Sequence, residues 1–161
     1  MKNTNISIYV PVYNGEKTIE RCINSVLKQS IKPINILILN DSSNDNTLEI
    51  LKKYEGLIRI KSNTSNLGLS HSRNIAVNEL KTRYIASIDA DVELDKNWLE
   101  ILYSNALKND ATLAGGRMYE KYLNNPFNYW RSLRIGQEWG DKDLSDPSFI
   151  FGCNNILDTE R

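Results

Sequence analysis

Cysteine and histidine are scarce in this sequence, which has two cysteines and one histidine among 161 residues. Cys22 and Cys153 are far apart and do not form a Cys-x-x-Cys motif, which argues against a zinc site and a disulfide framework. We therefore expect two reduced thiols in the cytosol. The single histidine, His71, has no Gly-x-Ser-x-Gly or paired His–Cys context, so we interpret it as a loop-packing or substrate-edge residue.

The sequence also lacks net charge and long apolar runs. Twenty basic and twenty acidic residues cancel, which argues against the basic surface that nucleic-acid binding needs. No apolar run approaches the roughly 20 residues of a membrane span. Residues 1–5 lead directly into a short apolar segment, so we predict no signal peptide and a cytoplasmic protein. Peripheral association with the inner face of the membrane, through a missing C-terminal region, stays open.

What is present is a regular alternation of strand and helix patterns. The length and a 40% hydrophobic content fit a single domain. Strands are predicted at 6–10, 34–39, 57–60, 84–88 and 111–114, and Pro11 is expected to end the first. Helical stripes between them include Ile19, Cys22, Ile23, Val26 and Leu27, then Leu48, Leu51 and Tyr54, then Ile75, Ala76 and Leu80, then Trp98, Leu99, Leu102 and Leu107. This order predicts an α/β fold with a mainly parallel sheet and helices on both faces.

Two C-terminal segments fit this alternation less well. From 119 to 147 the periodicity fades, and the segment is aromatic and charged. We expect a long loop or a helix plus loop there, and we favour core and lid packing over sugar stacking for its aromatic residues, which are Tyr119, Tyr122, Phe127, Tyr129, Trp130 and Trp139. Residues 149–161 are typical of the start of an element, which predicts a chain truncated at its C-terminus.

Polar residues follow the predicted strands at the ends where ligands bind in such sheets. These residues are Tyr13, Asn14, Asp41, Asn66, Asp89 and Asp91. Because the carboxyl ends of parallel strands meet at one edge, we expect their side chains to converge on one crevice.

The tripeptide Asp89-Ala90-Asp91 directly follows a buried strand. In an extended backbone, side chains at i and i+2 lie on the same face, so the two carboxylates could share a cation, or a cation and a ribose. Mg²⁺ and Mn²⁺ prefer a few carboxylates together with phosphate oxygens and water. The tripeptide therefore predicts a site that neutralises a departing diphosphate.

Two further loops carry candidate binding residues. Asp41 ends the second predicted strand and can accept a hydrogen bond from a donor such as the imide of uracil, whereas Asn44 or Asp45 is expected to cap the next helix. Gly68 permits a close approach of the backbone. Arg73, in the first turns of the following helix, can reach a base or a phosphate, with a surface salt bridge as the alternative.

Together these motifs resemble the family 2 glycosyltransferases of the GT-A fold. The resemblance covers roughly the first two thirds of the chain. It is carried by Val10-Pro11-Val12-Tyr13-Asn14 with Glu16, by 40–47 (Asn-Asp-Ser-Ser-Asn-Asp-Asn-Thr), by Asn66-Leu67-Gly68 with Ser72-Arg73-Asn74, and by Asp89-Ala90-Asp91. A later segment, Gly152-Cys153-Asn154, is similar to the Gly-Gly-Asn of the family, which faces donor and acceptor.

The resemblance implies a GT-A-type three-layer sandwich over 1–161, with a nucleotide-binding half at 1–95 and a partial acceptor-side half at 96–161. It also implies an inverting transfer of a sugar from a nucleoside diphosphate donor, commonly a UDP-sugar, to a hydroxyl of a glycan or lipid-linked acceptor in polysaccharide assembly. The implied nucleotide-binding residues are Pro11, Tyr13, Glu16, Asp41, Asn66, Gly68, Arg73 and Asp89. Asp91, with Asp89, would bind Mg²⁺ or Mn²⁺.

Three departures from the family pattern bear on this interpretation. Asn40 replaces an aspartate, which weakens one acidic contact without removing Asp41. Ser42-Ser43 replaces Gly-Ser, so the second loop is expected to bend differently. The Glu-Asp pair of the family, whose aspartate is the usual base, falls beyond residue 161, and Asp158 and Glu160 do not match it. Asp141, Asp143 and Asp146 are weak substitutes, so no residue is assigned as the base. The open alternatives are a non-catalytic nucleotide-sugar-binding module and, much less favoured, a phosphotransferase or receiver domain.

Overall fold

The computed structural model describes residues 5–134 and 144–161. Six strands form one sheet in the order β3-β2-β1-β4-β6-β5. Their bounds are β1 (Ile6–Val12), β2 (Asn35–Asn40), β3 (Arg59–Ser62), β4 (Tyr84–Ile88), β5 (Leu113–Gly115) and β6 (Asn154–Asp158). The predicted α/β class and the mainly parallel sheet are confirmed, because β3, β2, β1 and β4 pair in parallel.

The first strand continues through Pro11, so the prediction that proline ends it is wrong. Pro11 pairs with Leu39 and Val12 with Asn40. The Ile34 N–H donates to the Ile6 carbonyl and the Asp41 N–H donates to the Val12 carbonyl, so the backbone N–H and C=O groups of the even residues of β1 point toward β2. Pro11 therefore faces β4, where pairing ends at Tyr9 and Ser87. Its missing N–H lies past the last pair, so the ladder loses no bond.

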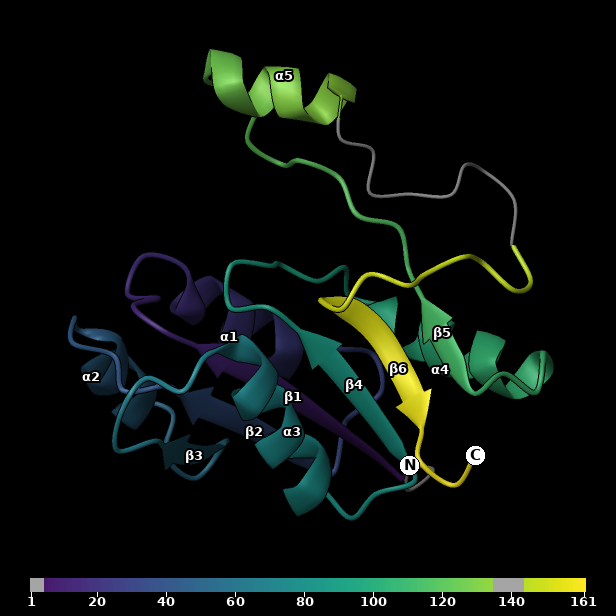
Figure 1. Cartoon of the computed structure of the whole chain (residues 1–161), viewed down its shortest axis with the longest axis horizontal. Coiled ribbons are helices and arrows are strands. Elements are labelled where there is room, and N and C mark those ends of the chain that lie inside the picture. The colour runs from purple at the N-terminus through teal and green to yellow at the C-terminus, as the bar shows by residue number, and fades with distance from the viewer. Residues whose placement is uncertain (1–4, 135–143) are drawn as a thin grey trace.

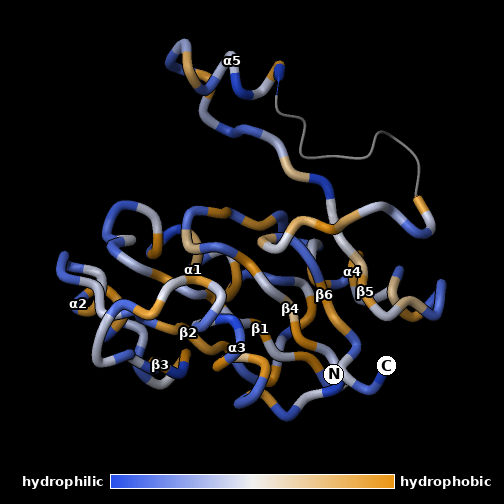
Figure 2. Tube along the Cα trace, viewed as in Figure 1, coloured by the Kyte–Doolittle hydropathy of each residue, from blue (hydrophilic) through white to orange (hydrophobic). Residues whose placement is uncertain are grey.

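Helices cover both faces of the sheet, as Figure 1 shows with α3 in front and α1 and α4 behind. The bounds are α1 (Ile19–Leu27), α2 (Thr47–Lys52), α3 (Leu69–Glu79) and α4 (Trp98–Lys108). One core holds the even residues of β1 with Cys22, Leu51 and Leu99, which come from α1, α2 and α4. The other holds Tyr9 with Ala76 of α3. Alternate strand residues thus fill two separate cores, and Figure 2 shows hydrophobic residues along the central strands and hydrophilic outer loops.

The last strand, β6, runs antiparallel between β4 and β5. The start of an element predicted at 149–161 is therefore a strand inside the sheet, with a neighbour on each side. Its buried residue Ile156 belongs to the same core as α1 and α4. This insertion places the turn before β6 next to the carboxyl end of β4, because Asn154 pairs with Ile88.

The described aromatic residues of the segment after β5 are exposed and do not belong to the core, so the interpretation of them as core residues is wrong. The segment includes α5 (Pro126–Arg134), which has no buried residue and lies away from the sheet in Figure 1. Tyr119 and Phe127 are more than 80% exposed, and Trp130 is 57% exposed. Trp139 lies outside the described residues. No helix within 5–134 or 144–161 is long and apolar enough to cross a membrane.

Two smaller predictions shift by one or two residues. The third strand is Arg59–Ser62 rather than 57–60, and Leu57 is exposed. On α4, Ala106 is buried and Leu107 is exposed. The buried face of this helix consists of Trp98, Leu99, Leu102 and Ala106.

Candidate active site

The carboxyl ends of β1, β2 and β4 meet at one edge of the sheet. The Asp41 N–H donates to the carbonyl of Val12 at 2.8 Å, which sets Tyr13 beside Asp41. Ser42 follows with a φ of 61°. That left-handed conformation is one that glycine adopts readily, so Ser42 keeps the turn at some conformational cost.

The loops after β1 and β2 are held together by side-chain hydrogen bonds. Glu16 Oε2 accepts from the backbone N–H and the side-chain amide of Asn46 at 3.1 and 3.0 Å. The Glu16 N–H donates to Asp45 Oδ2 at 3.1 Å, and the Gly15 N–H donates to Thr47 Oγ1 at 2.8 Å. Asp45 Oδ1 also accepts from the Thr47 N–H at 3.0 Å. The N-cap of α2 is Asn46, one residue later than predicted, and its side chain makes no cap hydrogen bond within the described chain. Glu16 therefore fixes the shape of this wall of the site.

Asp41 is buried and organises the loop that leads into α3. Its Oδ1 accepts from the Asn63 amide at 2.6 Å and from the Leu67 N–H at 2.9 Å, and its Oδ2 accepts from the Gly68 N–H at 2.8 Å. Burial alone would raise the pKa of Asp41. These hydrogen bonds and the nearby His71 outweigh it and lower the pKa below its ordinary value. Asp41 is therefore a fixed negative charge at the edge of the sheet.

Arg73 and Asp89 meet across two elements. Arg73 is in α3 and Asp89 directly follows β4, and Arg73 Nη2 lies 2.9 Å from Asp89 Oδ1. Both side chains are about a third exposed. Gly152, just before β6, packs against this guanidinium: a Cβ built there would meet Arg73 Nη1 at 2.9 Å. Arg73, for which a surface salt bridge was the alternative to a ligand contact, thus forms a partly buried ion pair with Asp89.

The Asp89-Ala90-Asp91 segment is a turn rather than extended backbone, because the Val92 N–H donates to the Asp89 carbonyl at 3.1 Å. Beneath it lies buried Cys22, whose thiol is 3.6 Å from the Asp89 carbonyl oxygen. Burial, followed by the negative charges of Asp91 and Asp89, raises the pKa of the Cys22 thiol to about 12. Both carboxylates of this turn thus disfavour the thiolate of Cys22.

The donor set of this turn fits a hard divalent cation. Within 5–134 and 144–161, no hydrogen bond or ion pair engages the exposed Asp91 carboxylate, and Asp89 Oδ2 has no partner there either. The same residues contain no group of three His, Cys, Asp or Glu side chains that could hold a metal. Two carboxylates with the remaining positions left to phosphate and water are a usual arrangement for Mg²⁺ or Mn²⁺.

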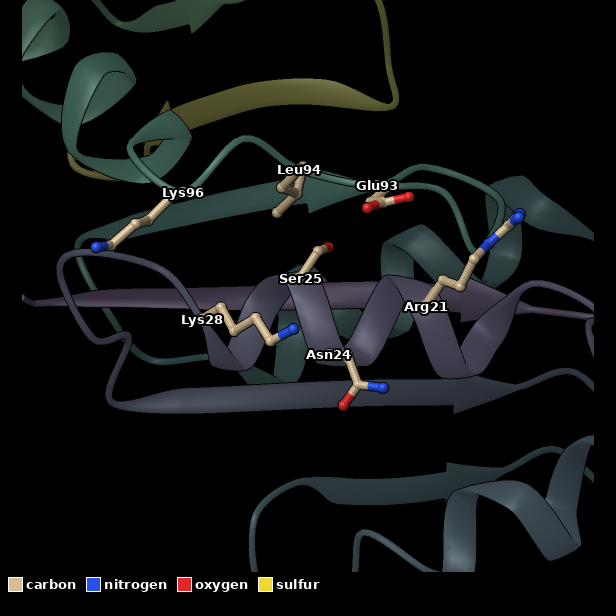
Figure 3. Close-up of a pocket in the computed structure, with 7 residues that line it drawn as sticks. All are labelled: Arg21, Asn24, Ser25, Lys28, Glu93, Leu94 and Lys96. Atoms are coloured by element: carbon tan, nitrogen blue, oxygen red, sulfur yellow. The ribbon is translucent and has the colours of Figure 1, made fainter. Parts of the chain in front are cut away.

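An open cavity of about 280 Å³ lies between α1 and residues 93–96, which follow this turn in sequence (Figure 3). Its lining consists of Arg21, Asn24, Ser25, Lys28, Glu93, Leu94 and Lys96, none of them a predicted site residue. Arg21 donates to the Tyr122 hydroxyl at 2.8 Å, and Lys121 lies 2.6 Å from Glu93. These contacts attach the segment after β5 to α1 and to the loop between β4 and α4.

Other predicted residues take different places. Pro11 is buried, and Tyr13 and Asn66 are exposed at the edge. Asn154 is buried, its amide oxygen accepting from Trp98 Nε1 at 2.6 Å and its amide nitrogen donating to the Arg117 carbonyl at 3.1 Å. Its side chain therefore supports the fold rather than facing a ligand.

Of the acidic residues weighed as a base, Asp158 pairs with Arg83 at the opposite end of β4, at 2.9 Å. Asp146 is exposed, and Asp141 and Asp143 lie outside the described residues. Sequence reasoning missed Asn63 and Asn46, which bind Asp41 and Glu16. Asn63 directly follows β3 at the same edge, so its position was a usable signal.

The sequence profile described as Glycosyl transferase family 2 matches residues 7–157. Glycosyltransferase GlyA of Streptococcus pneumoniae is 32% identical over 158 residues, which cover 97% of this chain and 22% of that protein. Poly(ribitol-phosphate) beta-N-acetylglucosaminyltransferase TarP of Staphylococcus aureus is 36% identical over 117 residues, 70% of this chain and 36% of that protein. The chain thus spans well under half the length of these relatives.

Solved structures share the fold. A mannosyltransferase of Pyrobaculum calidifontis superposes with a TM-score of 0.72 at 15% identity, over 99% of this chain and 46% of that one. Residues 1–349 of S. aureus TarS superpose with a TM-score of 0.66 at 22% identity, over 96% and 47%. These are GT-A glycosyltransferases. With the profile match over nearly its whole length, the chain belongs to glycosyl transferase family 2.

Proposed function

We propose that this chain forms the donor-binding part of a glycosyltransferase that moves a sugar from a nucleoside diphosphate, with uridine as the nucleoside, to an acceptor hydroxyl. One observation carries the proposal: the Arg73–Asp89 pair lies beside the exposed carboxylate of Asp91, at the edge where Asp41 is held. This edge is where ligands bind in mainly parallel sheets.

Ligands of related proteins support this choice of donor. TarS has been solved with UDP and with UDP-GlcNAc. The Pyrobaculum mannosyltransferase was solved with GDP-Man and Mn²⁺, and GalNAc-T7 with UDP, GalNAc and Mn²⁺. We choose UDP because TarS and GalNAc-T7 were both solved with a uridine nucleotide. A carboxylate offers about four acceptor positions, and Asp41 uses three of them within the described chain. One remains for the imide N–H of uracil.

In this proposal Tyr13, Asp41 and Arg73 hold the nucleotide, with Pro11, Glu16, Asn66 and Gly68 shaping the loops around it. Asp89 binds the ribose or a metal-bound water, and Asp91 binds Mg²⁺ or Mn²⁺. The bound cation supplies positive charge to the departing diphosphate.

The transfer proposed is inverting. The acceptor oxygen bonds to the anomeric carbon from the face opposite the diphosphate, the bond from that carbon to the diphosphate oxygen breaks, and its electron pair leaves with the nucleotide. The acceptor proton passes to a base that we do not assign. The acceptor we propose is a glycan or lipid-linked hydroxyl in polysaccharide assembly.

Calorimetry with UDP, with and without Mn²⁺, tests the donor and metal roles together. We expect Mn²⁺ to strengthen UDP binding to the wild type and to have little effect on Asp91→Asn. Asp110→Asn is the matched control, since Asp110 is exposed at the far end of α4. Equal metal dependence in wild type and Asp91→Asn contradicts the metal role, and tighter binding of GDP than UDP contradicts the choice of nucleoside.

Release of UDP from a panel of UDP-sugars tests turnover separately. Because no base is assigned in this chain, binding without turnover fits both the donor-binding part of an enzyme and a non-catalytic module, whereas release of UDP from any of these UDP-sugars contradicts the non-catalytic module.

A further inference from the structure

Among the described residues, the Arg73 side chain makes one hydrogen-bonded ion pair at the candidate site. Its Nη2 binds Asp89, whereas its Nε is buried and has no hydrogen-bond partner among the described residues. One side of the guanidinium is covered by Gly152. The position of the guanidinium therefore depends on one ion pair and on the shape of the backbone at residue 152.

The turn that carries Gly152 is fixed by hydrogen bonds. The Asn154 N–H closes it onto the Phe151 carbonyl at 3.2 Å, and the Asn155 amide donates to the same carbonyl at 2.9 Å. Buried Ser87 of β4, two residues before Asp89, donates to the Gly152 carbonyl at 2.8 Å. The turn is thereby attached to the strand that presents Asp89.

The three atoms nearest to a Cβ added at residue 152 all belong to Arg73. The added Cβ would lie 2.9 Å from Nη1, 3.2 Å from Cζ and 3.3 Å from Nη2. Gly152 is not one of the glycines with a positive φ, so alanine is compatible with its backbone. Because the turn is held by three hydrogen bonds and the guanidinium is the free end of a flexible side chain, the guanidinium is the group that moves.

We propose that Gly152 is a positioning residue: its lack of a side chain lets Arg73 lie against the turn and keeps the guanidinium on Asp89. Gly152 then controls donor binding without touching the donor. This inference rests on the proposed function in one respect, namely that Arg73 and Asp89 bind the nucleotide and the ribose or metal-bound water.

A double-mutant cycle on UDP binding in the presence of Mn²⁺ tests it. We expect Gly152→Ala to weaken UDP binding about tenfold, the effect of displacing one charge-assisted hydrogen bond. Its melting temperature should stay within about 2 °C of wild type, since only a side-chain end must move. In the Arg73→Ala background, Gly152→Ala should have no further effect on UDP binding, because the group it displaces is gone.

Gly116→Ala is the matched control. Its Cβ would meet Asn154 Oδ1 at 2.8 Å, an equally close approach that does not involve Arg73. Any effect of this control on UDP binding should be the same with Arg73 or Ala at residue 73. An equal loss of affinity from Gly152→Ala in both backgrounds, or no loss in either, overturns the positioning role while leaving the proposed function standing.

A second experiment tests the positioning role of Gly152 without a nucleotide. The coupling between Arg73→Ala and Asp89→Ala, measured by urea unfolding, should be detectable with Gly152 and lost with Ala at residue 152. Unchanged coupling overturns the inference. If the wild type binds neither UDP nor GDP, the proposed function fails, and this experiment still decides whether Gly152 positions Arg73.

Discussion

Asp41 Oδ2 accepts a 2.8 Å hydrogen bond from the N–H of Gly68, the residue directly before α3. Gly68 has a φ of 85°, which brings its N–H to the carboxylate at the end of β2. Since α3 carries Arg73, this contact connects the end of one strand to the helix that supplies the candidate guanidinium. The loop before α3 is thus fixed by a buried charge rather than by packing alone.

The first prediction concerns Asp41→Asn. An amide oxygen cannot replace both carboxylate oxygens, so at least one donor among Asn63, Leu67 and Gly68 is left unpaired. We expect the free energy of unfolding in urea at pH 7 to fall by about 1–3 kcal/mol. Asn66→Ala, at an exposed position in the same loop, should change it by less than about 0.5 kcal/mol. Equal effects from the two variants would mean that the carboxylate does not hold the loop.

The second prediction concerns pH. The pKa of Asp41 is lowered in the folded protein, whereas an unfolded aspartate titrates near about 3.9. The unfolded state therefore takes up protons first as the pH falls, and the stabilisation from ionised Asp41 is present above about pH 5 and lost progressively below it. The difference in unfolding free energy between wild type and Asp41→Asn should shrink between pH 5 and pH 3. A constant difference across that range contradicts a lowered pKa.

The third prediction concerns Gly116. A Cβ there would lie 2.8 Å from Asn154 Oδ1, and Asn154 is buried and held by Trp98 and the Arg117 carbonyl. Because this neighbour cannot move freely, Gly116→Ala should lower the free energy of unfolding by about 1–3 kcal/mol. Thermal or urea unfolding measures it, with Gly152→Ala as the comparison in which the neighbour is flexible. If Gly116→Ala lowers the free energy of unfolding less than Gly152→Ala does, then Asn154 is not the more rigid of the two neighbours, and the prediction is wrong.

The fourth prediction concerns the thiols. Cys22 is fully buried under the Asp89 turn, and its pKa is raised to about 12, so little thiolate forms and reagents cannot reach it. At pH 8 a disulfide reagent should modify Cys22 only after unfolding, with Cys22→Ser as the variant that identifies the signal. Cys153 is half-buried and should react first. Rapid labelling of Cys22 in the native protein would show that the turn opens.

Several features of the fold followed from sequence because their signals are local. The runs 34–39 and 84–88 are apolar and bounded by turn residues, and they become the buried strands β2 and β4. Since parallel strands align their carboxyl ends, the residues after them, Asp41 and Asp89, could be placed at one edge before any contact was known. Tyr13 and Asn14, which follow the first strand, could be placed at the same edge for this reason.

Other features depended on contacts distant in sequence. Periodicity cannot show that β6 lies antiparallel between β4 and β5, because the pairing of distant strands leaves no local repeat. The continuation of β1 through Pro11 depended on where β1 stops pairing with β4. The exposure of Phe127 and Trp130 depended on the position of α5 relative to the core.

The sequence by itself determined the α/β class and the family, and it supplied the carboxylates and the arginine from which a donor site could be built. Local patterns of burial and turn residues carry that information. Only the tertiary structure decided that Gly152 lies against Arg73, 79 positions away in sequence, that Arg73 pairs with Asp89, and that Asp41 holds the loop before α3. These contacts join separate elements, so they exist only once the sheet has brought its strand ends together.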